Sequence, residues 1–201
     1  MSVTISKPPS IISQHIRNLR RIVDTWEELN IPGIAAASTL ANACIRASSS
    51  SSPTGLNNKS TVLTLEDDVI AYTARLQIIT NARAETLGCA DKLLAWWTSL
   101  RDIITSIRNA LSLALPTTIT RADALLDELR DLFLIEVTIR RTVARKLGVS
   151  SDNDNESSLE GLDRQVATAA VAAWALRAYA VPTRITLILD ALDLIAVSAT
   201  T

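Results

Sequence analysis

The most regular pattern along the chain is a heptad repeat of apolar residues between about Leu65 and Leu115. Only Arg83 and Thr86 interrupt its two apolar positions. A helix that buries a broad face in a compact globule drifts away from a period of about 3.5 residues, so about seven heptads in one register are typical of a helix that packs along a long seam. With a rise of about 1.5 Å per residue, the predicted helix would span roughly 75 Å.

Gly88 lies inside the repeat without changing its register, which favours one continuous helix that is weakened or gently bent there. The first core position holds Val69, Leu76, Ala90, Trp97, Ile104 and Leu111. The second core position holds Tyr72, Ile79, Leu93, Leu100, Ile107 and Ala114. Trp96 falls outside both sets, so we expect it to face another surface, either against a helix of the same chain or toward a partner protein.

A second apolar stripe, with spacings of four and three residues, runs from Ile12 to Trp26. Ser10 precedes it and is placed to cap the helix that this stripe predicts. The segment 30–33, Asn-Ile-Pro-Gly, should end the helix, because proline lacks an amide donor and glycine permits left-handed backbone geometry. A short alanine-rich helix is expected after it, over about 34–47.

Three further helices are expected after Pro116, over about 118–147, 159–180 and 183–197, because apolar residues again recur at spacings of three and four. The inner face expected for the first is Leu125, Leu129, Leu132, Phe133, Ile139 and Val143. For the second it is Leu159, Leu162, Val166, Ala169, Ala173, Leu176 and Ala180. For the last it is Ile185, Ile188, Leu189, Leu192 and Ile195.

Two segments have the composition of flexible linkers. About 48–62 is rich in serine, and about 149–158 is acidic, so neither can bury enough apolar surface to order itself. The sequence therefore predicts a single all-α domain over 1–201, an elongated antiparallel helical bundle of about six helices with coiled-coil character.

Composition supports this fold and excludes several classes of protein. Hydrophobic residues make up 48% of the chain, but glycine (5) and proline (6) are too scarce for a fold of many short strands. The net charge of -1 provides no drive toward nucleic acid. No apolar run is long enough to span a membrane, and peripheral membrane binding through about 11–29 is a weaker alternative. We expect an intracellular protein, cytoplasmic or nuclear, with mitochondrial targeting a minor alternative.

Candidate chemistry is sparse, so we expect no enzyme, no cofactor and no metal site. The sequence has no phosphate-binding glycine loop and no metal-binding or nucleophile motif. Cys44 and Cys89 are expected to be buried apolar residues, with a disulfide between them the alternative, and His15 is expected at a surface or boundary. Three carboxylate pairs are expected on solvated helix faces: Asp67 with Asp68, Asp123 with Asp127, and Asp190 with Asp193.

Four cations gather near the end of the helix expected over 118–147, where they complement the helix dipole or dock an acidic partner: Arg140, Arg141, Arg145 and Lys146. That helix can cover only about 45 Å of the long one, so Val69–Thr86 must pack on other helices or on another chain. We hypothesise that the acidic segment around Asp152 neutralises Arg83. The candidate interaction surface is Val69, Tyr72, Leu76, Ile79, Arg83 and Trp96.

The function expected from this pattern is that of a non-enzymatic interaction or scaffold subunit, which binds other helical protein chains, of its own kind or another. An alternative is a binding module whose helices 34–47 and 159–180 line an apolar pocket for a lipid or small hydrophobic ligand. In its linkers and long heptad helices the chain resembles, in a generic way, small subunits of eukaryotic kinetochore, tethering or transcription-mediator complexes.

Overall fold

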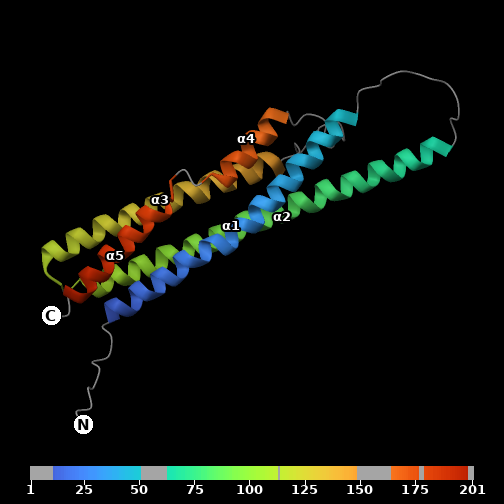
Figure 1. Cartoon of the computed structure of the whole chain (residues 1–201). Helices are drawn as coiled ribbons and strands as arrows, with labels where there is room; N and C mark the ends of the chain where they lie inside the picture. The colour runs from blue at the N-terminus through green and yellow to red at the C-terminus, as the bar shows by residue number, and fades with distance from the viewer. Residues whose placement is uncertain (1–10, 51–62, 113, 149–163, 177–178, 199–201) are drawn as a thin grey trace, which may run out of the picture. The chain divides into compact units, whose positions relative to one another are not determined.

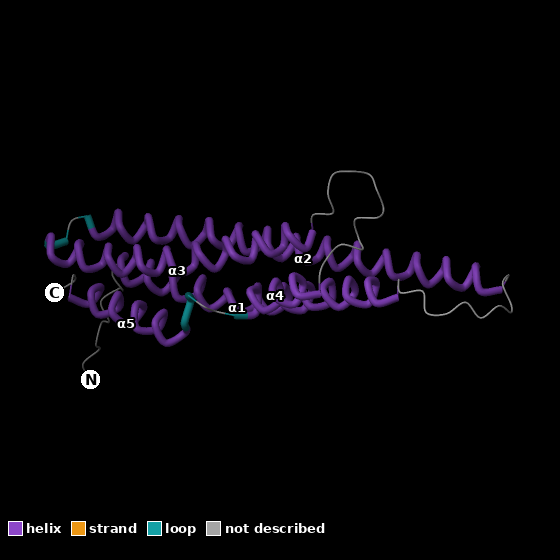
Figure 2. Tube along the Cα trace, turned by 90° about the horizontal axis from the view of Figure 1, so that it is seen from above, coloured by secondary structure: helices purple, strands orange, loops and turns teal. Residues whose placement is uncertain are grey.

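A computed structural model describes residues 11–50, 63–112, 114–148, 164–176 and 179–198 (Figure 1). All of the secondary structure in these ranges is helical, and the helices pack together: α1 (Ile11–Ser50), α2 (Leu63–Leu111), α3 (Pro116–Gly148), α4 (Arg164–Ala175) and α5 (Pro182–Ser198). Only helices and short loops are coloured in the second view (Figure 2). The prediction of an all-α protein is confirmed.

The described residues form five helices rather than about six, because α1 runs without a break through the segment 30–33. Pro32 lies inside α1 and faces solvent. Its neighbours Asn30 and Gly33 are buried against other helices, and these contacts hold the helix through the proline. The predicted helix end there is wrong. The predicted linker 48–62 also begins too early, since α1 ends at Ser50.

The long helix predicted over 65–115 corresponds to α2, which has 49 residues and ends at Leu111. The amides of Ser112 and Ala114 bond to carbonyls of the last helical turn, and Pro116 then opens α3. Proline suits the first position of a helix, because the amide that it lacks has no partner there. The serine-rich residues 51–62 and the acidic segment 149–158 lie outside the described residues.

The chain divides into two compact units. Unit 1 comprises residues 1–28, 93–137 and 177–201, and unit 2 comprises residues 29–92 and 138–176. Each of α1, α2 and α3 therefore contributes residues to both units. The predicted organisation as a single domain stays a prediction.

In unit 1, parts of α1, α2 and α3 join α5, and every neighbouring pair of these helices is tied by a polar contact. The indole Nε1 of Trp96 on α2 donates a hydrogen bond to the carbonyl of Ile22 on α1 at 2.7 Å. The other three pairs are tied by ion pairs: Arg108 with Asp123 and Asp127 (α2 and α3), Arg184 with Glu128 (α3 and α5), and Arg20 with Asp190 and Asp193 (α5 and α1).

Neighbouring helices in unit 1 run antiparallel. Arg108 on α2 pairs with Asp123 near the start of α3, whereas Trp96, earlier on α2, contacts Phe133, later on α3. The two contacts between α3 and α5 follow the same rule, since Glu128 meets Arg184 and Glu136 meets the earlier backbone at Ala180. Unit 1 is thus a four-helix bundle with antiparallel neighbours.

Three aromatic residues from three helices form the centre of unit 1. The ring centroids of Trp26 and Trp96 are 4.8 Å apart, and Phe133 lies 5.2 Å and 4.9 Å from them in edge-on geometry. Trp96 is 6% exposed, while Trp97 is only half-buried, so the heptad prediction selected the wrong tryptophan. Trp96 is the buried tryptophan because its ring contacts Trp26 and Phe133 and its indole donates a hydrogen bond to the carbonyl of Ile22.

The predicted inner face is confirmed for α5, and the faces predicted for α3 and α4 are confirmed only in part. All five residues predicted for α5 are buried. On α3, Leu129, Phe133 and Val143 are buried as predicted, but Leu126 takes the core position expected for Leu125. On α4 the predicted stripe is wrong at Ala169 and Leu176, which are exposed, and the core residues there are Ala170 and Trp174. Ala180, after α4, is buried as predicted, and the side chains of Leu159, Leu162 and Val166 lie outside the described residues. The bulky indole of Trp174 fixes that face, although its neighbours are nearly all alanine.

Unit 2 holds the remaining parts of α1, α2 and α3 together with α4. Trp174 on α4 lies so close to Gly33 on α1 that a Cβ there would stand 2.6 Å from the indole ring. Arg140 on α3 donates a hydrogen bond from Nε to Oδ1 of Asn30 on α1 at 2.5 Å. These two contacts explain why α1 needs small and polar residues at positions that the sequence pattern assigns to a break.

Candidate interaction surface

Four apolar side chains on the N-terminal part of α2 face solvent, and we call this set the α2 outer face. Their exposed fractions are 60% for Val69, 67% for Ile70, 52% for Tyr72 and 50% for Ile78. Two of them, Val69 and Tyr72, belong to the predicted interaction surface. With about 100° between successive residues of a helix, Ile70 and Ile78 lie about 100° and 180° around the helix from Val69, so the four side chains share a segment of α2 rather than one continuous patch.

The other predicted surface residues do not all join this set. Ile79 is buried in unit 2, and Leu76 and Arg83 are half-buried. Trp96 belongs to unit 1, where it is part of the aromatic core. The hypothesis that Trp96 anchors a partner is therefore wrong, and its alternative, packing against α1, is confirmed by the hydrogen bond to Ile22.

Among the helices that the structure describes, α2 extends beyond the end of α1 in unit 2. Arg46 on α1 and Arg75 on α2 line one groove; from these residues α1 continues for about four residues to Ser50, whereas α2 continues for about 12 residues to Leu63. The excess is about eight residues, or roughly 12 Å of helix. In both views the first turns of α2 extend past the ends of α3 and α4 (Figures 1 and 2).

A groove of about 510 Å³ lies beside the α2 outer face, between α1 and α2 in unit 2. Its lining residues are Thr39, Asn42, Ala43 and Arg46 from α1 and Arg75 and Ile78 from α2. The only charged residue of α1 after Glu28 is Arg46, and the only charged residues of α2 between Val69 and Ala84 are Arg75 and Arg83. Two of the six residues that line the groove are therefore arginines, and none of the six is a carboxylate.

Arg83 is half-buried at the edge of this region. Its Nε is enclosed and has no hydrogen-bond acceptor among the residues that the structure describes. The acidic segment around Asp152, which we hypothesised as its partner, lies outside those residues. The hypothesis stays a prediction.

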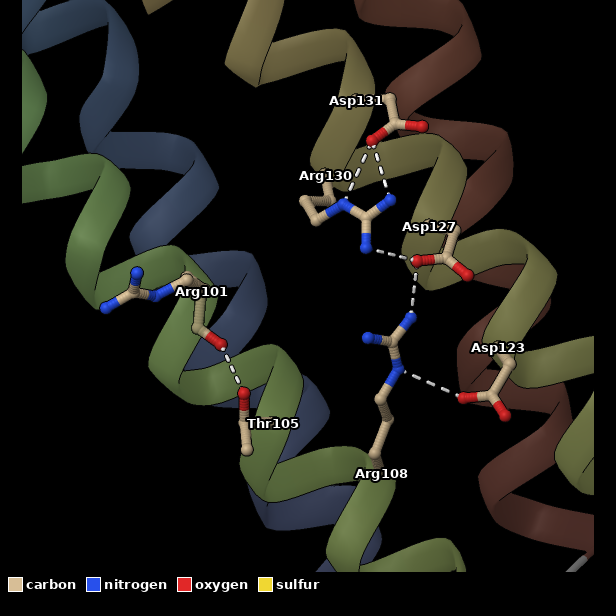
Figure 3. A network of polar contacts seen from close by, with 7 residues as sticks. All are labelled: Arg101, Thr105, Arg108, Asp123, Asp127, Arg130 and Asp131. Carbon is tan, nitrogen blue, oxygen red and sulfur yellow. Dashed lines mark hydrogen bonds and ion pairs between the residues drawn. The ribbon is translucent and has the colours of Figure 1, made fainter.

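The predicted carboxylate pairs that the structure describes are partly exposed, as expected on solvated helix faces, and each pair is bound by an arginine. Figure 3 shows Arg108 between Asp123 and Asp127, at 3.1 Å and 2.6 Å. Arg130 also reaches Asp127, at 2.6 Å, and its neighbour Asp131, at 2.8 Å. The hydrogen bond from Arg108 is the main reason why the pKa of Asp127 lies below its usual range, with the charge of Arg130 adding to it.

A second arginine joins the other described pair in the same way. Arg20 contacts Asp190 and Asp193, each at 2.6 Å, and the hydrogen bond to Asp190 is the main cause of the raised pKa of Arg20. Within the described ranges no group of three or more histidine, cysteine or acidic side chains is placed to hold a metal ion. These carboxylates tie helices together.

The sequence analysis missed the burial of three polar residues, since it placed Arg140 among the cations at a helix end and Asn30 in a helix break. Glu136, fully buried, accepts hydrogen bonds from the backbone amides of Tyr179 and Ala180 at 2.8 Å and 3.0 Å. In unit 2, Arg140 and Asn30 are equally buried and bond to each other. A signal was present, because Glu136 and Arg140 stand at inner-face spacing from predicted core residues of α3.

The two cysteines and the histidine offer no described catalytic arrangement. Cys89 is buried and free, and burial raises the pKa of its thiol, as predicted for an apolar role. The side chain of Cys44 lies outside the described residues. His15 is half-buried, which agrees with the predicted boundary position.

Comparison with protein-family models finds no match to this sequence, and comparison with curated proteins finds none either. Within the described ranges, none of the helices is both long and apolar enough to cross a membrane. The case for a function therefore rests on the surface of the molecule itself.

Proposed function

We propose that this protein is a non-enzymatic interaction or scaffold subunit that binds a helix of another protein chain through the α2 outer face. The observation that carries the proposal is the exposure of Val69, Ile70, Tyr72 and Ile78 on a helix that outruns its neighbours. Apolar side chains exposed on a helix are a common feature of protein interaction sites.

The heptad register indicates how the partner packs. Val69 and Tyr72 continue the same seam that buries Leu93, Leu100 and Ile107 in unit 1. A partner helix laid along this seam would extend the packing of α2 as a coiled coil does, with side chains of each helix inserted between those of the other.

The four exposed side chains of the α2 outer face can contribute only a limited binding free energy by themselves. Burying one such side chain completely contributes about 1.5–3 kcal/mol. Association costs about 4–15 kcal/mol in lost freedom of motion. Four partly exposed side chains only offset that cost, so a stable complex must also use surface beside the α2 outer face.

The test is affinity purification of the full chain from its native source, with quantification of the co-purified proteins. A triple variant, Val69→Ser with Ile70→Ser and Tyr72→Ser, should lose them while its thermal unfolding stays unchanged. The matched control changes three equally exposed residues on α5, namely Leu187, Leu194 and Val197, to serine. The proposal is wrong if the triple variant keeps every partner, or if the control loses the same partners.

Neither alternative from the sequence gains support from a specific contact. Trp174 of α4 packs closely on Gly33 in the alanine-rich part of α1. At this contact the indole ring, rather than a ligand, fills the space between the two helices. Ile16, Leu19 and Val23, which would have to enter a membrane surface, are buried in unit 1. The ligand-pocket hypothesis stays an untested prediction.

A further inference from the structure

A cleft of about 240 Å³ lies in unit 1, between the first part of α1 and the start of α5. Its base is apolar, because six of the residues that line it are buried and uncharged: Val23, Trp26, Phe133, Ala180, Ile185 and Leu189. An apolar cavity of about 150 Å³ is enough to hold benzene. The cleft therefore has room for one aromatic ring or a short aliphatic chain.

The rim of the cleft carries acidic side chains. Asp24 and Glu27 line it from α1, and their spacing of three residues places them on one side of the helix. Glu27 already has an interaction within the chain. Asp24 is exposed and makes no ion pair or hydrogen bond through its side chain with another residue that the structure describes. Asp24 is thus the carboxylate of the rim that a ligand can reach.

The cations near the cleft are occupied by the chain's own carboxylates. Arg20 lines the cleft and contacts Asp190 and Asp193 of α5, each at 2.6 Å. Arg184, in the first turn of α5, pairs with Glu128 of α3 and does not line the cleft. Neither guanidinium group is therefore available to hold the carboxylate of a ligand.

Two further cations of α1, Arg17 and Arg21, stand outside the lining. Arg17 donates a hydrogen bond to the carbonyl of Ser13, and Arg21 lines a separate groove together with Asp102 of α2. Acidic side chains thus outnumber basic ones around the mouth of the cleft. Because like charges disfavour a complex, an anionic ligand such as a fatty acid fits the cleft poorly, whereas a protonated amine suits it.

We propose that this cleft binds a small organic amine, with its apolar body inside the cleft and its ammonium group at the rim beside Asp24. The body, of about the size of one ring, packs against the side chains of Trp26 and Leu189. This binding is independent of the α2 outer face, because every residue that lines the cleft belongs to unit 1, whereas the α2 outer face belongs to unit 2.

Three probes that share a phenyl ring and a two-carbon chain test the charge preference: phenethylamine, phenylpropanamide and phenylpropanoate. Each is titrated into the full chain, and proton–nitrogen NMR follows the indole N–H signals. The signal of Trp26 should shift, while that of Trp174 in unit 2 should not. The amine should bind at least about threefold more tightly than the carboxylate, a modest factor because the ion pair at the rim is exposed to water.

Two variants and a matched control locate the amine. Asp24→Asn should remove the preference for the amine over the amide, while the amide binds as before. Asp102→Asn removes another exposed carboxylate of unit 1, in a different groove, and should keep the preference. Thr186→Trp fills the mouth of the cleft from an exposed position on α5, so it should weaken binding of all three probes without changing thermal unfolding.

The expected order of affinity is amine, then amide, then carboxylate, with a shift of the Trp26 signal for each probe that binds. Four results would overturn the inference: no shift of the Trp26 signal with millimolar amine, a carboxylate that binds as tightly as the amine, a preference that survives Asp24→Asn, or equal binding of the amine by Thr186→Trp and wild type. The proposed function is unaffected by any of them, because its test relies on co-purified proteins and variants of α2.

Discussion

Unit 1 and unit 2 contain parts of the same long helix in different environments. In unit 1, the seam residues Leu93, Leu100 and Ile107 are fully buried, and polar contacts tie every neighbouring pair of helices. In unit 2, the seam residues Val69 and Tyr72 are 60% and 52% exposed. A heptad repeat therefore specifies which face of a helix can pack, but helix lengths decide where a partner from the same chain is available.

The arginines differ between the two units in a corresponding way. Arg108 bridges two carboxylates in unit 1, so that charge holds helices together there. In unit 2, Arg46 and Arg75 line the groove between α1 and α2 together with four uncharged residues.

The largest effect is expected in the aromatic core of unit 1. Phe133→Ala should lower the free energy of unfolding by about 3–5 kcal/mol, because it leaves a cavity against Trp26 and Trp96. Leu134→Ala, at the next position but 42% exposed, should cost less than about 0.5 kcal/mol. Chemical denaturation measures both, and equal losses would contradict the assigned core.

A pair of glycine substitutions compares two helical sites. Gly33→Ala should destabilise the protein by about 1–3 kcal/mol, because the new Cβ would stand 2.6 Å from the indole of Trp174. Gly88→Ala should instead stabilise it by up to about 1 kcal/mol, since nothing lies within 4 Å of that Cβ and alanine favours helix. Thermal unfolding of both variants decides the sign, and a stabilising Gly33→Ala would contradict the packing of α1 on α4.

A smaller effect depends on pH. The pKa of Asp127 is lowered in the folded state by Arg108, so the ion pair contributes its full stabilisation above the unfolded-state pKa of about 3.9 and loses it as the pH falls further. Asp127→Asn should therefore cost about 0.5–1 kcal/mol at neutral pH, because the carboxylate is partly exposed. The difference from wild type should shrink as the pH falls through the lowered pKa of Asp127 in the folded protein.

Urea titrations at several pH values measure this effect. Asp102→Asn is the matched control, because Asp102 is more exposed and lies 3.9 Å from Arg101. Its effect at neutral pH should be smaller than that of Asp127→Asn. A difference for Asp127→Asn that persists in acid would show that the ion pair is not its source.

The sequence predicts helices more successfully than it predicts their ends and interior polar contacts. Periodicity placed α2 and the buried face of α5 correctly, because both depend on local spacing. It failed at residues 30–33, where Asn30 and Gly33 meet residues far away along the chain. No local rule reveals that Arg140 and Trp174 stand opposite them.

The candidate surface was predicted in part for a similar reason. Comparing helix lengths indicated that the helix after Pro116 cannot cover Val69 and Tyr72, and both side chains are exposed in the structure. The choice between Trp96 and Trp97 depended on ring contacts with α1 and α3, which the heptad pattern does not contain. The groove between α1 and α2 was missed because it required α1 to continue beyond Pro32.

Hydrogen exchange along α2 tests most directly whether one helix has both a covered and an uncovered part. At low protein concentration and without a partner, amides of residues 69–78 should exchange at least about 100-fold faster than those of residues 93–107, because local opening there exposes few buried contacts. Addition of a partner that binds the α2 outer face should remove the difference. Equal protection of the two segments in the isolated protein would contradict the account.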